Sequence, residues 1–402
     1  MTPGARIQAA IDCLDVIFDG APAEKTLTGW ARRSRFAGSR DRAAVRDHVF
    51  DALRCRDSYA AIAGDDSTLS ARSVMLGLCR DQNLPMALLF SGEGHAPQPL
   101  TDEEQVWLDA GGTSTSESLA RQCPDMQAWC FDKLQSAHPE TAVAIAKALT
   151  SRAPVDLRAN LRKVSVAAAI AMLADDGVSA QECDVSNTAL RIVDGARKVK
   201  NTKAYLDGFV ELQDAGSQAL IEALIGQVQV QGSTRILDFC AGGGGKSLAL
   251  AAHSGTTLFA HDANAARMKD IPERARRAGV VIERLARNDL AKKAPFDLTL
   301  CDVPCSGSGA WRRSPDAKWR LSEAQFSQLI ELQSNILSEA SALVRPGGIL
   351  AYATCSLFSE ENEDQVTRFL KSAPKYEKIR QLSWSPLDGC DGFHLSILHR
   401  AG

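Results

Sequence analysis

The fold is decided by one stretch of the chain, Asp238-Phe239-Cys240-Ala241-Gly242-Gly243-Gly244-Gly245-Lys246-Ser247. It follows an apolar run that is typical of a buried strand, and it opens a helix. Glycines let the backbone turn tightly and let a ligand approach the main chain, while the first amides of the helix point toward that ligand. The stretch therefore predicts a strand, a binding loop and a helix in succession.

The order strand, loop, helix repeats from about residue 231 onward. Candidate strands are Thr234–Cys240, Thr257–His261, Val280–Ile282, Phe296–Cys301 and Ile349–Thr354. Helical stretches separate most of them, which predicts an α/β domain with a doubly wound, mostly parallel sheet at 231–402. Ligands bind outside the carboxyl ends of the strands in such a sheet, so the site is expected there.

Two segments of different character precede this domain. Residues 1–145 are expected to be mostly helical, because apolar residues recur at helical spacing, as between Ile7 and Phe18. Residues 150–230 alternate like a half-buried strand at 154–161 and continue with a helical stretch at 166–173. We therefore expect a small α+β segment between the helical part and the main domain.

The bulk composition excludes several classes of protein. Of the 402 residues, 45% are hydrophobic and 24% are charged, as in ordinary globular proteins of two or three domains. No apolar run approaches the roughly 18 residues that a membrane span needs, and the N-terminus lacks the apolar core of a secretory signal. Eleven cysteines without a C-x-x-C pair disfavour a disulfide framework or a zinc site. We expect a cytoplasmic monomer with no membrane and no metal partner.

Basic residues gather in three places although the net charge is −3. They are eight arginines between Arg32 and Arg56, a group from Arg191 to Lys203, and the set Arg312, Arg313, Lys318 and Arg320. Such patches can follow a phosphate backbone. A solvated helix face is an equally good interpretation of any single cluster.

Three ligands compete for the glycine loop. A Walker loop needs G-x-x-x-x-G-K-[ST], but Cys240 stands where its first glycine should be. The dinucleotide fingerprint G-x-G-x-x-G fails at Ser247. S-adenosylmethionine remains the best candidate, with Asp262 at the end of the second strand placed for the ribose hydroxyls and Asp289 for the adenine edge.

Two thiols lie after strand-like runs. Cys305 stands in Asp302-Val303-Pro304-Cys305-Ser306-Gly307, and Cys355 stands in Tyr352-Ala353-Thr354-Cys355-Ser356. A thiolate that adds to C6 of a cytosine makes C5 nucleophilic enough to attack a sulfonium methyl group, and a base must then remove the C5 proton. Asp302 is placed to supply or hold a proton at N3. The residues alone leave open which thiol attacks.

These blocks resemble the RsmB/NOP (Sun/Fmu) family of S-adenosylmethionine-dependent RNA cytosine-C5 methyltransferases of the bacterial 16S rRNA type. The matching blocks are Asp238–Ser247, Asp302–Gly309 with Arg312–Asp316, and Tyr352–Ser356 with Glu361–Glu363. Gly38–Arg42 and Ala52–Arg54 resemble that family's NusB-like RNA-binding domain. The resemblance implies a class I (Rossmann-like) methyltransferase domain at 231–402, an all-α NusB-like domain at 1–145 and a small α+β segment at 150–230.

The resemblance also implies residue roles. Cys355 corresponds to the nucleophile, Cys305 to the thiol that helps release the product, and Asp302 to the acid at the base and cofactor. The cofactor site corresponds to Cys240, Ala241, Gly242, Gly243, Gly244, Gly245, Lys246, Asp262, Asp289 and Asp302. DNA cytosine methyltransferases instead use a Pro-Cys thiol resembling Cys305, so the order of the thiols rests on the family.

The chain departs from the family in the glycine loop, where Gly242-Gly243 replaces the usual Ala-Pro. The hypothesis is methyl transfer from S-adenosylmethionine to C5 of a cytidine in RNA, most plausibly 16S rRNA, which makes RNA the expected partner and rRNA processing the expected role. The alternatives are a tRNA cytosine-C5 methyltransferase and a non-catalytic RNA-binding ribosome-assembly factor. A methyltransferase acting on an amine or a protein side chain is disfavoured, because Val303-Pro304-Cys305 lacks the aromatic residue that such sites carry.

Overall fold

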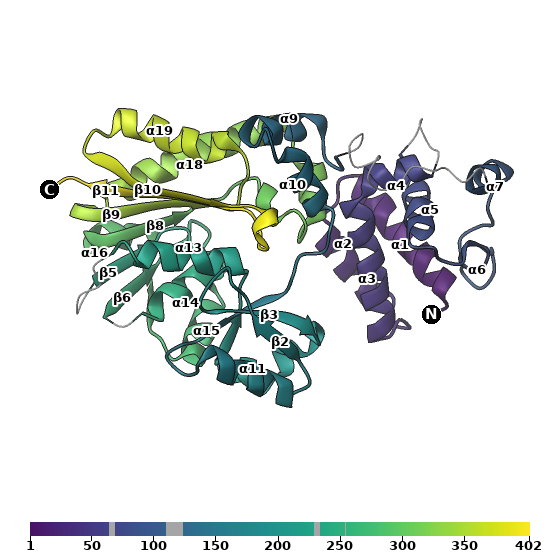
Figure 1. Ribbon diagram of the computed structural model, residues 1–402, viewed down its shortest axis with the longest axis horizontal. Helices are drawn as coiled ribbons and strands as arrows, with labels where there is room; N and C mark the ends of the chain where they lie inside the picture. The colour runs from purple at the N-terminus through teal and green to yellow at the C-terminus, as the bar shows by residue number, and fades with distance from the viewer. Residues whose placement is uncertain (64–68, 110–123, 229–233, 254) are drawn as a thin grey trace. The chain divides into compact units, whose positions relative to one another are not determined.

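The computed structural model describes residues 1–63, 69–109, 124–228, 234–253 and 255–402. The chain forms two compact units (Figure 1). One contains Met1–Arg152 together with Trp311–Ser322, and the other contains Ala153–Ala310 together with Glu323–Gly402. A short segment that follows the Cys305 loop in sequence is thus part of the N-terminal unit.

The second unit is built on a seven-stranded sheet of order β10-β11-β9-β8-β5-β6-β7. Its strands are β5 (Thr234–Asp238), β6 (Thr256–Ala260), β7 (Ile282–Arg284), β8 (Phe296–Asp302), β9 (Val344–Thr354), β10 (Tyr376–Trp384) and β11 (Phe393–Arg400). The pairs formed among β5 to β9 are all parallel, whereas β11 runs antiparallel to both β9 and β10. The predicted α/β fold with a mostly parallel sheet is confirmed.

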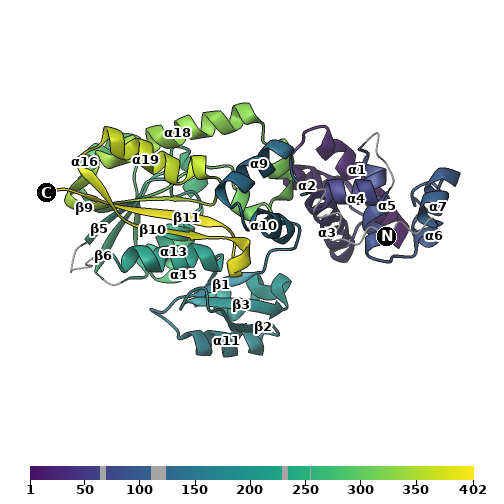
Figure 2. The ribbon, with the colours of Figure 1, turned by 45° about the horizontal axis from the view of Figure 1, so that its top comes forward.

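Helices cover both faces of this sheet (Figures 1 and 2). They are α13 (Ala215–Ile225), α14 (Gly245–Ala251), α15 (Ile271–Ala278), α16 (Arg287–Lys293), α18 (Glu323–Ser341) and α19 (Glu363–Ser372). Successive side chains of a strand point to opposite faces. In β5, Ile236 therefore packs in the core under α13 and α14, whereas Leu237 packs in the core under α16, α18 and α19. Because both faces are buried there, the central strands β5, β6, β8 and β9 are mostly apolar, which made them recognisable in the sequence.

The strand bounds differ from the predicted ones. β7 shares only Ile282 with the predicted strand Val280–Ile282, and β5, β6 and β8 differ by one or two residues at their ends. β9 begins at Val344, five residues before the predicted start, and includes Gly347, whose φ of +69° suits glycine. The antiparallel pair β10 and β11 was not predicted. β10 is an edge strand with mostly exposed side chains, so it has no apolar run to mark it.

A second, four-stranded sheet of order β2-β3-β1-β4 is antiparallel throughout. Its strands are β1 (Asp156–Ala159), β2 (Ser179–Glu182), β3 (Ala189–Asp194) and β4 (Val210–Leu212), with α11 (Val166–Asp175) and α12 (Lys203–Leu206). Leu157, Leu173 and Leu190 form the centre of its own small core. This is the expected α+β segment, although the predicted boundary at 230 lies outside the described residues.

The N-terminal unit is helical, as the sequence predicts. Its helices are α1 (Pro3–Phe18), α2 (Ala23–Arg33), α3 (Ser39–Arg54), α4 (Arg56–Ile62), α5 (Ala71–Asp81), α6 (Met86–Leu89), α7 (Asp102–Asp109), α9 (Ala128–Ala137), α10 (Ala142–Leu149) and α17 (Pro315–Arg320). Ile7, Leu14 and Ile17 of α1 are buried in one core with Val45 and Val49 of α3. No helix in the described part of the chain has the length and apolar character needed to cross a bilayer.

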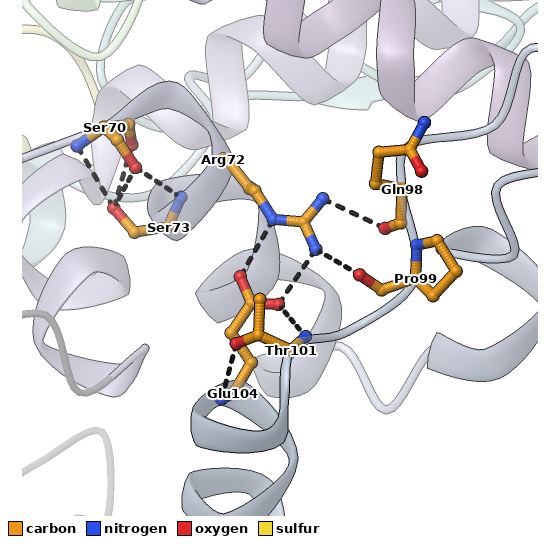
Figure 3. A network of polar contacts seen from close by, with 7 residues as sticks. All are labelled: Ser70, Arg72, Ser73, Gln98, Pro99, Thr101 and Glu104. Atoms are coloured by element: carbon orange, nitrogen blue, oxygen red, sulfur yellow. Dashed lines mark hydrogen bonds and ion pairs between the residues drawn. The ribbon is translucent and has the colours of Figure 1, made fainter.

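One arginine ties down the loop between α6 and α7 (Figure 3). The Arg72 guanidinium donates to the carbonyl oxygens of Gln98 and Pro99, both at 3.1 Å, and to both carboxylate oxygens of Glu104, at 2.8 and 2.9 Å. Glu104 also accepts from the Thr101 amide at 2.8 Å, while its own amide donates to Thr101 Oγ1. The hydrogen bond from Arg72 lowers the pKa of Glu104. Charge-assisted hydrogen bonds therefore help to order this loop, while Phe90 at one end of it packs in the core of the unit and Leu100 at the other end packs against that core.

Several residues of the predicted basic clusters are internal. Arg54 is buried and donates to the Arg312 carbonyl at 2.8 Å and to Asp51 at 2.6 Å. Lys318 is 1% exposed, and its Nζ donates to the Arg54 carbonyl at 2.7 Å. These cations fasten the 311–322 segment within the N-terminal unit, so they are not available to follow a phosphate backbone.

Candidate active site

The two thiols predicted to react lie side by side. β8 and β9 are parallel neighbours with Asp302 opposite Ala353, so the loops that follow them emerge at the same edge of the sheet. Cys355 follows β9 directly, and Cys305 lies three residues beyond β8. Their Sγ atoms are 3.4 Å apart, and both residues are half-buried. A group bonded to one sulfur is thus within reach of the other.

The charge environment favours a neutral thiol at Cys305. Its pKa lies well above the ordinary value because of the hydrogen bond with Cys355, and because of burial and the nearby charges of Cys355 and Glu361. A thiol that keeps its proton is a hydrogen-bond donor rather than a nucleophile. This state of Cys305 suits a residue that assists Cys355.

Asp302, at the end of β8, pairs with the first turn of α14. Lys246 Nζ lies 2.7 Å from Asp302 Oδ2, and the two side chains are 11% and 28% exposed. Burial lowers the pKa of Lys246. The charge and hydrogen bond of Asp302, together with the charges of Cys355 and Asp238, raise it by more, so the net shift of this pKa is upward. Lys246 is therefore a fixed cation between the glycine loop and the thiols. The sequence placed it only among the cofactor residues and did not predict this pairing.

The glycine loop has the backbone that the sequence requires. Gly242 and Gly244 have φ of +52° and +83°, which favour glycine. Gly242 stands where the resembled family has alanine, so the departure lies at a left-handed position. Gly245, the first residue of α14, has no atom within 4 Å of where a Cβ would lie. The loop therefore leaves open space against its main chain.

Two buried carboxylates flank this loop. Asp238, which ends β5, is 1% exposed and receives a hydrogen bond from Ser247 at 2.6 Å, while its Oδ1 has no partner among the described residues. Burial raises the pKa of Asp238 to about 7, against the opposing effect of Ser247. Asp262 accepts from the amides of Gly242 and Asn264, both at 2.9 Å. An open glycine loop beside an unpartnered buried oxygen fits a polar ligand such as S-adenosylmethionine.

The remaining predicted cofactor residues differ in their surroundings. Arg267, which is 57% exposed, lies 3.3 Å from Asp262 and must share that carboxylate with any ribose. Asp289 lies in the first turn of α16, half-exposed, and pairs with Lys292 at 2.9 Å. Burial raises the pKa of Cys240 far above its ordinary value, so its thiol is not a competing nucleophile. The roles of Asp262, Asp289 and Cys240 stay predictions.

One functional residue was missed. Glu361 lies in the block Glu361–Glu363 that resembles the family, but nothing in its spacing along the chain showed that it is buried beside both thiol loops. His394, which follows Phe393 near the C-terminus, is fully buried and hydrogen-bonded to Ser396 at 2.9 Å, and burial lowers its pKa to about 4. Within this structure, His394 packs.

Comparison with known proteins shows a similarity to one family. Residues 226–391 match the model of the 16S rRNA methyltransferase RsmB/F family. This part of the chain is similar to the RsmB/F methyltransferase family. Residues 126–199 match the ferredoxin-like domain of RsmF/B-like methyltransferases, in agreement with the small antiparallel sheet. The resemblance seen in the sequence is confirmed.

Individual relatives agree with the RsmB/F assignment. Ribosomal RNA small subunit methyltransferase B of Cronobacter sakazakii is 32% identical over 252 residues, which are 61% of this chain and 58% of the relative. The match therefore spans less than two thirds of that relative. The crystal structure of PH0851 superposes with a TM-score of 0.76 at 20% identity, covering 100% of this chain and 99% of that one. A methyltransferase homologue from Pyrococcus horikoshii superposes with a TM-score of 0.57 at 22% identity, covering 68% of this chain and 100% of that one. These two likenesses support the fold.

Proposed function

We propose that the protein transfers a methyl group from S-adenosylmethionine to C5 of a cytidine in RNA, with 16S rRNA as the substrate. The observation that carries this proposal is the 3.4 Å approach of Cys305 and Cys355 at the strand edge that also bears the Asp302–Lys246 pair. The RsmB/F family match and the rRNA methyltransferase names of its relatives support the choice of reaction and RNA.

The cofactor site is formed by the glycine loop from Cys240 to Lys246, with Asp262 and Asp289. Bound S-adenosylmethionine supplies an electrophilic methyl group on sulfonium. Asp262 accepts hydrogen bonds from the ribose hydroxyls with the lone pairs that the Gly242 and Asn264 amides leave free. Lys246 bonds to Oδ2 of Asp302, whereas Oδ1 of Asp302 makes no hydrogen bond within the described residues. That oxygen is the one available to a proton at N3 of the cytosine.

In the first step, the Cys355 thiolate adds to C6 of the cytosine. The new S–C6 bond uses a sulfur electron pair, and the pair of the C5–C6 double bond moves to C5. A proton taken up from solvent at N3 and hydrogen-bonded to Oδ1 of Asp302 balances the charge that develops on the ring, and it leaves N3 when the C5–C6 double bond re-forms. C5 then takes the methyl group, and the sulfonium electron pair returns to sulfur.

Cys305 completes the reaction. Its thiol donates its proton to the departing sulfur of Cys355, and the resulting Cys305 thiolate accepts the C5 proton. The C5–H pair re-forms the C5–C6 double bond as the C6–S bond breaks, so protons and electrons balance. Neutral Cys305 within 3.4 Å of Cys355 is the arrangement this transfer needs.

The test incubates the protein with tritiated S-adenosylmethionine and separate pools of unmodified 16S rRNA and tRNA. We expect label at cytosine C5 in the rRNA; label confined to tRNA would change the substrate, and its absence from both pools would refute the reaction. We also expect Cys305→Ala to accumulate an RNA adduct that survives denaturing electrophoresis, whereas Cys355→Ala forms none. The reverse pattern would exchange the two roles.

A further inference from the structure

A buried carboxylate connects the two thiol loops. Glu361 is 0% exposed and ends a short 3-10 helix, Ser359–Glu361, between β9 and α19. Its carboxylate accepts hydrogen bonds from the Ser306 amide at 2.8 Å and from Gln333 Nε2 at 2.9 Å. It also accepts from the hydroxyls of Ser306 and Ser356. Four donors converge on one charged group, and such bonds are the stronger kind.

The donors come from both sides of the thiol pair. Ser306 follows Cys305 directly, and Ser356 follows Cys355 directly. Further bonds join the same loops without Glu361. The Gly309 amide donates to the Cys355 carbonyl at 2.9 Å, the Leu357 amide donates to Ser308 Oγ at 2.8 Å, and Ser356 Oγ lies 3.3 Å from Ser306 Oγ and 3.1 Å from Ser308 Oγ. Glu361 is nevertheless the one charged side chain, among the described residues, that bonds to the neighbours of both cysteines.

We infer that Glu361 is a positioning residue, which sets the separation of the Cys305 and Cys355 sulfurs by holding Ser306 and Ser356 on a single carboxylate. Its effect on methyl transfer rests on the proposed function, whereas its effect on the thiol pair does not. The charge of Glu361 is also among the influences that keep Cys305 a neutral thiol, after the hydrogen bond with Cys355, burial and the charge of Cys355. Glu361 therefore supports the division of labour between the two sulfurs.

The site requires a carboxylate in particular. A carboxylate only accepts hydrogen bonds, so it satisfies a backbone amide, a side-chain amide and two hydroxyls together. In Glu361→Gln one oxygen becomes an NH2 group, which faces the Gln333 amide donor or the hydroxyls with the wrong polarity. At least one buried group then loses its partner or turns, and the loops shift. A nucleophile misplaced by about 1 Å costs roughly 100-fold in rate.

The thiol pair can be assayed without RNA or cofactor. Phenylarsine oxide condenses with two adjacent thiols to give a dithioarsenite and water, with no change in redox state of the sulfurs. We expect the full-length protein to capture the reagent at Cys305 and Cys355, as mapped by peptide mass, and Cys305→Ala to lose that capture. Glu361→Gln should capture it at least 10-fold more slowly. Glu363→Gln, a carboxylate substitution two residues away, is the matched control and should behave like the unaltered chain.

Methyl transfer supplies the second readout. We expect Glu361→Gln to lower kcat about 100-fold while the KM values for RNA and S-adenosylmethionine stay unchanged, with Glu363→Gln unaffected. If Glu361→Gln does not fold, Ser356→Ala removes one arm of the same contact and should slow capture in the same direction. Capture by Glu361→Gln at the normal rate, or no capture by the unaltered protein, would overturn the inference. Normal capture without methylation of any RNA would instead overturn the proposed function alone.

Discussion

Removing the charge of Asp302 tests how strongly the site depends on its ion pair. Asp302→Asn keeps the shape of the side chain, so Lys246 retains an acceptor but loses its counter-ion. At 2.7 Å the attraction is about 6 kcal/mol for an effective dielectric constant of about 20. Burial of Lys246 offsets much of this, and loss of one partner of a buried pair costs about 3–5 kcal/mol.

Asp302 is 28% exposed, which places the cost below that range. We expect Asp302→Asn to lower the free energy of unfolding of the second unit by about 2–3 kcal/mol at pH 7. Hydrogen exchange of the β8 and β9 peptides, followed across a urea series, isolates that unit. Glu339→Gln is the control, because its 2.8 Å pair with Arg287 joins side chains 48% and 66% exposed and should change stability by less than about 0.5 kcal/mol.

The pH dependence has a definite sign. In the unaltered protein the net pKa shift of Lys246 is upward, so its stabilising contribution is complete below the ordinary lysine pKa of about 10.4 and is lost above the folded value. In Asp302→Asn, burial then lowers that pKa, and stability rises with pH instead. The difference in the free energy of unfolding between the unaltered protein and Asp302→Asn should narrow above about pH 10. A variant indistinguishable from the Glu339→Gln control at pH 7 would refute this account of the pair.

Two further substitutions test the backbone of the loop and the buried lysine. Gly244→Ala should lower the free energy of unfolding by about 2–4 kcal/mol, because φ is +83° and a Cβ would lie 2.7 Å from Ile271 Cγ1. Gly245→Ala is the control and should be near neutral, because the space around its Cβ position is open. Equal melting temperatures of the two variants would contradict this prediction. Burial lowers the pKa of Lys318 to about 8. Between about pH 8 and 10.5 the unfolded state therefore binds more protons than the folded state, and the free energy of unfolding of the first unit rises with pH by about 3 kcal/mol. Lys318→Met should abolish that rise in urea titrations read by tryptophan fluorescence, and a parallel rise in both proteins would contradict it.

Much of the fold was predictable because its signals are local. The apolar runs of β5, β6 and β8 mark strands buried on both faces, and the glycine loop marks the turn into α14. β10 was not recognisable, since an edge strand with exposed polar side chains has the composition of a loop. The sequence also does not show which members of the basic clusters are buried: Arg54 and Lys318 donate hydrogen bonds to backbone carbonyls.

The sequence by itself determined the residue types of the site, and the RsmB/F match of residues 226–391 supports that interpretation. Glycines, aspartates and cysteines at strand ends follow from local chemistry, so their positions along the chain were enough to propose a cofactor loop and two reactive thiols. Only the tertiary structure decided which of them meet. Fifty residues separate Cys305 from Cys355, and 56 separate Lys246 from Asp302. Such contacts depend on the order of parallel strands and on a buried carboxylate, Glu361, which lies 55 residues from Ser306 and 28 from Gln333 in sequence.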